Sequence, residues 1–224
     1  MNHSLPEVVL FDVGNTLLFP DWQRILAPLV ERHAAPTSEQ LRETERETKA
    51  AFDRLAVGNL DRDFWRMFYV RLLQVVGIAD DALVTKLTAA TRTSANWGRV
   101  LPGTRAALDR ISSRFRIGVI SNADGKIDQV LKVCGICDCF LSITDSGIAG
   151  YEKPRREIFA AALRSMNVAP GLALYVGDMY SVDYVGATGA GMQAVLFDAA
   201  GAYRESGLPR VESLQELEHR LGSA

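Results

Sequence analysis

The chain has 224 residues, of which 48% are hydrophobic and 23% are charged, a composition typical of a globular protein and unlike that of a disordered one. Its formal net charge of −2 at pH 7 gives no general attraction for nucleic acid or for an anionic membrane. We see no basic leader before a short apolar run, and no apolar stretch long enough to span a bilayer. We therefore expect a cytoplasmic monomer or homodimer that binds neither nucleic acid nor membrane.

The first apolar run, residues 8–11 (Val-Val-Leu-Phe), is rich in residues that favour strands, and it ends at Asp12. Gly14 and Asn15 follow at once and favour a turn. Ligands of open α/β sheets bind beyond the carboxyl ends of strands, so this carboxylate lies where chemistry is expected. Taken alone, an Asp in this place is more often a turn former or helix cap than a catalyst.

From about residue 22 to residue 95, apolar residues recur at helical spacing and predict about four helices. The helix expected at residues 41–55 is highly charged, and an aromatic stripe in the next one suits a hydrophobic core better than a ligand platform. This segment interrupts the chain directly after the first strand. We predict that residues 19–95 form a cap domain over the site, and that residues 1–18 and 96–224 form the catalytic core.

After residue 101 the pattern alternates between strands and helices. Strands are expected at residues 116–120, near 140–143, and at 172–176 and 193–197, with a terminal helix at 213–221. Such alternation is typical of a parallel sheet with right-handed crossovers. The predicted fold is α/β, with a Rossmann-like parallel sheet core, helices on both faces and an inserted α-helical cap.

Small polar or acidic residues follow three of these strands, and a loop adds a lysine. If the strands are neighbours, Asp12, Ser121, Lys153 and Asp178 meet in one crevice. Two close carboxylates repel each other unless a cation lies between them, and carboxylate and carbonyl oxygens suit Mg²⁺. A lysine and a hydroxyl beside that ion suit a phosphate group, and an Asp carboxylate can attack phosphorus to form an aspartyl-phosphate. Individually, each residue is at least as well explained by a structural role, as a turn former, a solvated charge or a helix cap.

The order and spacing of these residues resemble the four motifs of the haloacid dehalogenase-like (HAD) hydrolase superfamily, in the subclass whose helical cap follows the first strand. The first motif resembles residues 12–17, Asp-Val-Gly-Asn-Thr-Leu, where the family usually has Asp-x-Asp-Gly-Thr-Leu. The others resemble residues 119–122 (Val-Ile-Ser-Asn), 153–154 (Lys-Pro), and 177–178 (Gly-Asp) with Asp183 five residues later. Together these motifs span nearly the whole chain.

The resemblance implies a nucleophile and a metal site. It implies that Asp12 is the nucleophile and binds Mg²⁺ together with Asp178 and the backbone carbonyl of Gly14. It further implies that Asp183 supports the metal, either through water or by orienting Lys153.

The resemblance also implies a binding site for a small phosphorylated substrate. Ser121 and Lys153 would bind the phosphoryl group that is transferred, and Asn122 would help to bind the substrate. Catalysis is therefore expected to involve Asp12, Ser121 and Lys153 directly.

Gly14 departs from the family's pattern, because the family's phosphatases have a second Asp at this position that acts as general acid and base. Such a catalyst is typically worth about 10²–10⁴-fold in rate. We therefore predict a Mg²⁺-dependent phosphohydrolase whose activity is weak or limited to good leaving groups, such as those of acyl or aryl phosphates. Asn15 in place of the family's Gly is a milder departure, since Asn tolerates left-handed backbone conformations.

Other functions stay open, because haloacid dehalogenases and phosphonate hydrolases of the family also lack the second Asp. Against a dehalogenase, Asp178 and Asp183 suit a metal that its reaction does not require. Against a phosphonate hydrolase, a cap lysine must form a Schiff base, and neither Lys49 nor Lys86 has evident support in the sequence. A catalytically silent binding or regulatory protein that keeps the fold is the third alternative.

Overall fold

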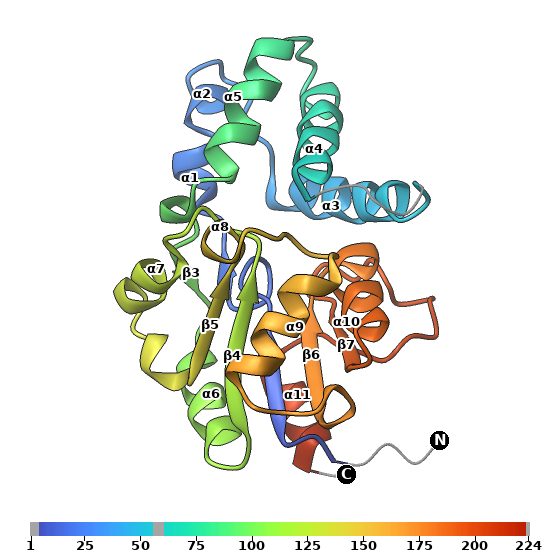
Figure 1. Ribbon diagram of the computed structural model, residues 1–224. Helices are drawn as coiled ribbons and strands as arrows, with labels where there is room; N and C mark the ends of the chain where they lie inside the picture. The colour runs from blue at the N-terminus through green and yellow to red at the C-terminus, as the bar shows by residue number, and fades with distance from the viewer. Residues whose placement is uncertain (1–4, 56–60, 223–224) are drawn as a thin grey trace.

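The structure is a computed structural model that describes residues 5–55 and 61–222, and its core is a parallel sheet of six strands in the order β5-β4-β1-β6-β7-β8 (Figure 1). The strands are β1 (Val8–Phe11), β4 (Arg116–Ser121), β5 (Ser142–Asp145), β6 (Ala173–Gly177), β7 (Gln193–Phe197) and β8 (Arg210–Val211). The predicted strands and the parallel α/β sheet are confirmed. Strand β8 was not predicted, because two residues are too few to form a pattern.

Helices cover both faces of the sheet, which explains why β1 reads as an unbroken apolar run. Val9 and Phe11 belong to one hydrophobic cluster with α6, α7 and α11, whereas Val8 and Leu10 belong to another with α9 and α10. All four side chains are completely buried. The helices concerned are α6 (Thr104–Ser112), α7 (Ile127–Val133), α9 (Arg156–Ser165), α10 (Val185–Gly189) and α11 (Leu214–Gly222). Short turns connect them: η1 (Ser94–Asn96), η2 (Cys137–Cys139), α8 (Ser146–Ala149), η3 (Pro170–Leu172) and the π-helical η4 (Tyr180–Tyr184).

The segment between β1 and the rest of the sheet consists of helices that lie beyond the carboxyl ends of the strands (Figure 1). We call them the helical insert: α1 (Trp22–Ile25), α2 (Ala27–Val30), α3 (Ser38–Phe52), α4 (Asp61–Val75) and α5 (Asp81–Thr91). The aromatic stripe of α4 packs in a hydrophobic cluster, as predicted, and this cluster also contains Met179 and Val182 of the segment after β6. No helix among the described residues is long and apolar enough to cross a membrane.

Helix α3 begins three residues before its predicted start, because Thr37 caps it. The Thr37 hydroxyl accepts a hydrogen bond from the Gln40 amide at 3.2 Å, and the Gln40 side chain accepts one from the Thr37 amide at 2.8 Å. This reciprocal capping box satisfies two amides that the first turn leaves without helical partners.

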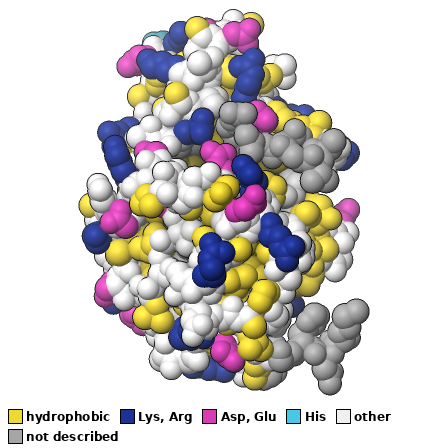
Figure 2. Space-filling model, in the orientation of Figure 1, with side chains coloured by type: hydrophobic (Ala, Val, Ile, Leu, Met, Phe, Trp, Pro, Cys, Tyr) yellow, Lys and Arg dark blue, Asp and Glu magenta, His cyan; other side chains and the backbone are white. Residues whose placement is uncertain are grey.

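The chain enters and leaves the insert through a short antiparallel ribbon of β2 (Leu18–Phe19) and β3 (Arg99–Val100). The two crossings therefore lie side by side, although they are far apart in the sequence. The division into residues 1–18 with 96–224 and residues 19–95 stays a prediction, and this ribbon lies where that division was placed. On the face drawn in Figure 2, acidic and basic side chains are interspersed, so the surface charge of that face is mixed.

Candidate active site

The predicted site residues meet because β4 and β6 are the two neighbours of β1. Phe11, the last residue of β1, is in register with Val119 of β4 and Val176 of β6, which lie two positions before Ser121 and Asp178. Asp12 therefore leaves the sheet between these two side chains. Parallel register places all three at the same edge, as the sequence predicted.

A cavity of about 420 Å³ lies between this edge and the helical insert. All seven predicted site residues line it: Asp12, Gly14, Ser121, Asn122, Lys153, Asp178 and Asp183. The insert and the chain returning from it contribute Phe64, Trp65, Arg92 and Trp97. The two aromatic residues of α4 among them thus border the cavity as well as packing in the insert's core, which the prediction of a purely structural role missed.

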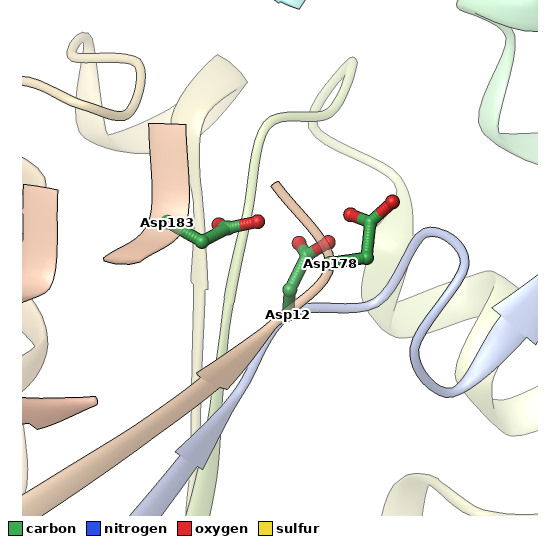
Figure 3. Close-up of side chains that lie close together, drawn as sticks. All are labelled: Asp12, Asp178 and Asp183. Carbon is green, nitrogen blue, oxygen red and sulfur yellow. The ribbon is translucent and has the colours of Figure 1, made fainter. Parts of the chain in front are cut away.

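Three buried carboxylates form an acidic cluster, and Figure 3 shows that of Asp183 pointing toward Asp12. One oxygen from each of Asp12, Asp178 and Asp183 lies within 4.8 Å of the others. Burial raises the pKa of Asp12 well above its ordinary value; Lys153 lowers it, but the other two carboxylates raise it further. Burial likewise raises the pKa of Asp178 to about 6, against the lowering effect of Lys49. A cation here would favour the ionised carboxylates, and oxygen-only ligands are those that Mg²⁺ prefers.

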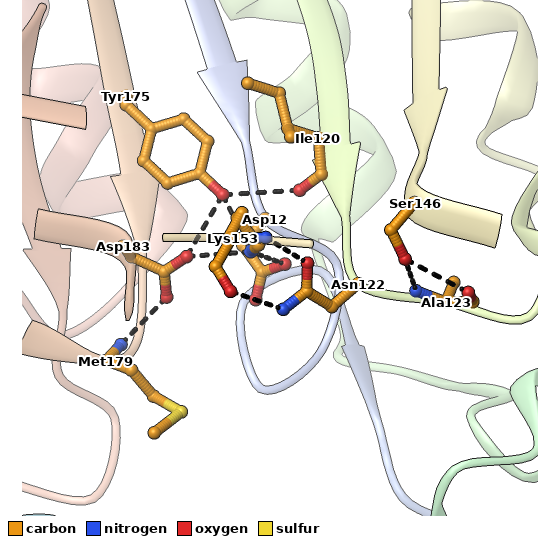
Figure 4. Close-up of polar contacts among 9 residues, drawn as sticks. All are labelled: Asp12, Ile120, Asn122, Ala123, Ser146, Lys153, Tyr175, Met179 and Asp183. Carbon is orange, nitrogen blue, oxygen red and sulfur yellow. Dashed lines mark hydrogen bonds and ion pairs between the residues drawn. The ribbon is translucent and has the colours of Figure 1, made fainter. Parts of the chain in front are cut away.

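The Lys153 ammonium lies at the centre of a hydrogen-bond network (Figure 4). Its Nζ donates to Asp12 Oδ1 at 2.6 Å and to Asp183 Oδ1 at 2.7 Å, and it lies 2.9 Å from the Tyr175 hydroxyl. Burial by itself lowers the pKa of Lys153, but the carboxylates of Asp12 and Asp183 outweigh it and raise the pKa well above its ordinary value. A fixed positive charge therefore lies beside the predicted nucleophile.

Asp183 is held on both of its carboxylate oxygens. Its Oδ1 contacts Lys153 and lies 3.1 Å from the Tyr175 hydroxyl, and its Oδ2 accepts a hydrogen bond from the Met179 amide at 3.0 Å. Of the two roles that the sequence left open for Asp183, this geometry fits the orientation of Lys153 best. The sequence analysis did not single out Tyr175, although a hydroxyl inside an otherwise apolar strand is a signal of a buried polar contact.

The side-chain amide of Asn122 forms two hydrogen bonds with the backbone of Lys153. Its Oδ1 accepts a hydrogen bond from the Lys153 amide at 2.7 Å, and its Nδ2 donates to the Lys153 carbonyl at 3.2 Å (Figure 4). The side chain therefore positions the lysine loop, and its predicted part in substrate binding stays a prediction. Ser121, at the end of β4, is buried at the cavity wall.

The space that a side chain at position 14 would use is taken by an indole ring. A Cβ built on Gly14 would lie 3.2 Å from Cζ3 and 3.4 Å from Cη2 of Trp97. The ring is anchored, because its Nε1 donates a hydrogen bond to the Thr91 carbonyl at 2.6 Å. Asn15 has a φ of 52°, so the left-handed backbone expected of it is confirmed.

Lys49 of α3 reaches the acidic cluster, which nothing in the sequence indicated. Its side chain is 1% exposed, and its Nζ lies 2.8 Å from Asp178 Oδ2 and 2.8 Å from Glu45 Oε1. Burial by itself lowers the pKa of Lys49, but the two carboxylates raise it well above its ordinary value. The highly charged sequence of α3 is typical of an exposed helix and gives no sign of this contact. Whether a lysine of α3 reaches a strand end depends on how the helix docks. Lys86, the other lysine considered, is exposed.

Comparison with known proteins gives a consistent result. A family model described as haloacid dehalogenase-like hydrolase matches residues 6–191. The chain is 30% identical over 203 residues to the haloacid dehalogenase-like hydrolase domain-containing protein 3 of Xenopus laevis, covering 84% of this chain and 83% of that one. It is 38% identical over 104 residues to a glyceraldehyde 3-phosphate phosphatase of Methanothermobacter thermautotrophicus, covering 45% of this chain and 46% of that one. The solved structure of the HAD-hydrolase YfnB from Bacillus subtilis, bound to magnesium, has the same fold, with a TM-score of 0.67 at 18% identity over 97% of this chain and 99% of that one.

Proposed function

The chain belongs to the haloacid dehalogenase-like hydrolase family, and we propose that it is a Mg²⁺-dependent phosphohydrolase that forms an aspartyl-phosphate on Asp12. Its substrate is a small phosphorylated metabolite with a good leaving group. The observation that carries the proposal is the buried Asp12 carboxylate, 2.6 Å from the Lys153 ammonium and beside two more carboxylates in a cavity. The relative that is named a phosphatase supports the reaction class.

The charges of the cavity fit a divalent cation. Four carboxylates, those of the acidic cluster and of Glu45, face the ammonium groups of Lys49 and Lys153, which leaves two formal negative charges where a phosphate dianion must enter. Asp12, Asp178 and the backbone carbonyl of Gly14 would hold Mg²⁺, which supplies positive charge to the oxygens of the transferring phosphoryl group.

The chain's own residues then perform a two-step displacement. Lys153 holds Asp12 by Oδ1, which leaves Oδ2 to attack phosphorus. The new Asp12 oxygen–phosphorus bond forms as the bond to the leaving oxygen breaks, and the leaving group departs with the electron pair. Water next attacks phosphorus as the Asp12 oxygen–phosphorus bond breaks. Its protons leave with the released phosphate, and the Asp12 carboxylate is restored. Ser121 and Lys153 bind the phosphoryl oxygens throughout.

Leaving-group preference follows from position 14. Gly14 has no proton to give, and the Trp97 ring fills the neighbouring space. No carboxylic acid at this position can therefore protonate the leaving group. The lost general acid catalysis is typically worth about 10²–10⁴-fold in rate. Acyl and aryl phosphates release stable anions and are the least affected.

A panel of acyl, aryl and alkyl phosphates, assayed with and without Mg²⁺, tests the proposal. We expect slow Mg²⁺-dependent release of phosphate from the acyl and aryl members, and complete loss in Asp12→Asn. Asp63→Asn, on an exposed residue of α4, is the matched control and should keep full activity. If no activated substrate turns over and no aspartyl-phosphate can be trapped, the proposal fails and a catalytically silent binding protein replaces it.

A phosphonate hydrolase is the second candidate, and the observation that favours it is the contact of Lys49 with Asp178, a residue that lines the cavity. Its two carboxylate partners keep Lys49 protonated, and an ammonium cannot attack a carbonyl to form a Schiff base, so we rank this function second. Borohydride trapping of a β-oxo phosphonate on Lys49 would reverse the ranking. Halide release from a 2-haloacid without added metal would instead support a dehalogenase.

A further inference from the structure

Lys49 of α3 and Asp53, the residue that caps the C-terminus of this helix, join the helical insert to the chain that follows β6. Lys49 Nζ lies 2.8 Å from Asp178 Oδ2. One helical turn later, Asp53 Oδ1 accepts a hydrogen bond from the Ser181 amide at 3.2 Å, and Asp53 Oδ2 accepts one from the Tyr203 hydroxyl at 2.9 Å. Helix α3 is therefore docked on the segment that begins with a predicted metal ligand.

The docked helix supplies a cation to that ligand. Lys153 pairs with Asp12 and Asp183, whereas Asp178 receives its positive charge from Lys49 on the insert. Since Lys49 is 1% exposed, water screens this charge very little. A metal ion bound to Asp178 would share one carboxylate with the ammonium, and two cations so close together in a buried site repel each other.

We propose that Lys49 and Mg²⁺ compete for Asp178, so that docking of α3 weakens metal binding. By thermodynamic linkage, metal binding weakens the docking of α3 to the same extent. The inference rests on the metal site of the proposed function and adds to it a group on the insert that sets the affinity of that site.

Lys49→Met tests the competition through metal binding alone. Mn²⁺ serves as the probe, its free concentration is measured by electron paramagnetic resonance, and Mg²⁺ affinity follows from displacement. We expect the variant to bind Mg²⁺ about tenfold more tightly than the wild type, because a like charge has been removed from beside the ion. Lys86→Met removes the same charge from an exposed position of α5 and should leave the affinity unchanged. Unchanged or weaker binding by Lys49→Met would overturn the inference.

Asp53→Asn tests the same idea without altering any group that touches Asp178. Loss of a nearby negative charge should by simple electrostatics weaken cation binding. Competition predicts the opposite. Asp53→Asn weakens the docking of α3, which moves Lys49 away from Asp178, and we expect Mg²⁺ binding to tighten by about threefold. In the Lys49→Met background the same change should add no tightening, as expected of two residues that act as a unit. Weaker binding by Asp53→Asn in the wild-type background would contradict the inference, whether or not Lys49→Met folds.

The same titrations separate failure of this inference from failure of the proposed function. If folded wild type and folded Lys49→Met both bind no Mn²⁺, the metal site is refuted and the proposed function with it. If both bind Mn²⁺ equally tightly, only the competition is refuted and the phosphohydrolase stands.

Discussion

Restoring an acid at position 14 is the most direct way to test why this site should favour good leaving groups. The Gly14 backbone lies outside the left-handed region, so it accepts an L side chain without strain. The obstacle is Trp97, whose ring would lie 3.2 Å and 3.4 Å from a new Cβ. We therefore expect Gly14→Asp by itself to push against an anchored ring, and Gly14→Asp with Trp97→Ala to have room for the carboxyl group.

The size of the effect follows from the role of the missing group. A general acid is worth about 10²–10⁴-fold, or about 3–5 kcal/mol of activation free energy. Alkyl phosphates, which release poorly stabilised alkoxides, should gain about 10²-fold in kcat/KM in the double variant, at the low end of this range. Aryl phosphates should change by only a few fold, since their leaving groups need little protonation. Gly14→Asp alone should fall well short of the double variant.

The assay is Mg²⁺-dependent phosphate release from one alkyl and one aryl phosphate by the wild type, both single variants and the double variant. Trp97→Ala alone is the control for lost packing against Trp65, whose ring centroid lies 5.6 Å away. If Gly14→Asp alone matches the double variant, the ring is not the obstacle. If neither gains activity while Mn²⁺ binding is intact, the absence of an acid at position 14 does not limit the reaction.

Other predictions concern the network around Lys153. Gly177→Ala places a Cβ 2.5 Å from Asp183 Cγ and should lower the free energy of unfolding by about 1–3 kcal/mol in urea titrations, together with activity; unchanged values would mean that the loop yields freely. Tyr175→Phe removes the hydroxyl 2.9 Å from Lys153 Nζ, and we expect a loss of about 1 kcal/mol in stability with the metal affinity retained. Asn122→Ala frees the Lys153 backbone and should raise KM for aryl phosphates; an effect on kcat alone would contradict a positioning role. Removal of metal with EDTA should abolish turnover, and Mg²⁺ should restore it.

Much of the fold and part of the site could be predicted from the sequence because their causes are local. The strand before Asp12 ends where Gly14 and Asn15 force a turn, and β-favouring runs alternate with helical periodicity along the core. Parallel strands with right-handed crossovers bring their carboxyl ends to one edge. Asp12, Ser121 and Asp178 were therefore expected at this edge, and the order β4-β1-β6 makes them neighbours.

Only the tertiary structure decided what surrounds these groups. The indole of Trp97 lies over Gly14 because the ribbon of β2 and β3 returns the chain beside the first motif, and two-residue strands leave no periodic signal. Lys49 reaches Asp178 because α3 docks on the loop after β6, whereas its own sequence resembles a solvated helix. Periodicity specifies which residues share a face of an element. It does not specify where that face docks, and here the docking of the helical insert determined which groups neighbour both the missing acid and the predicted metal ligand.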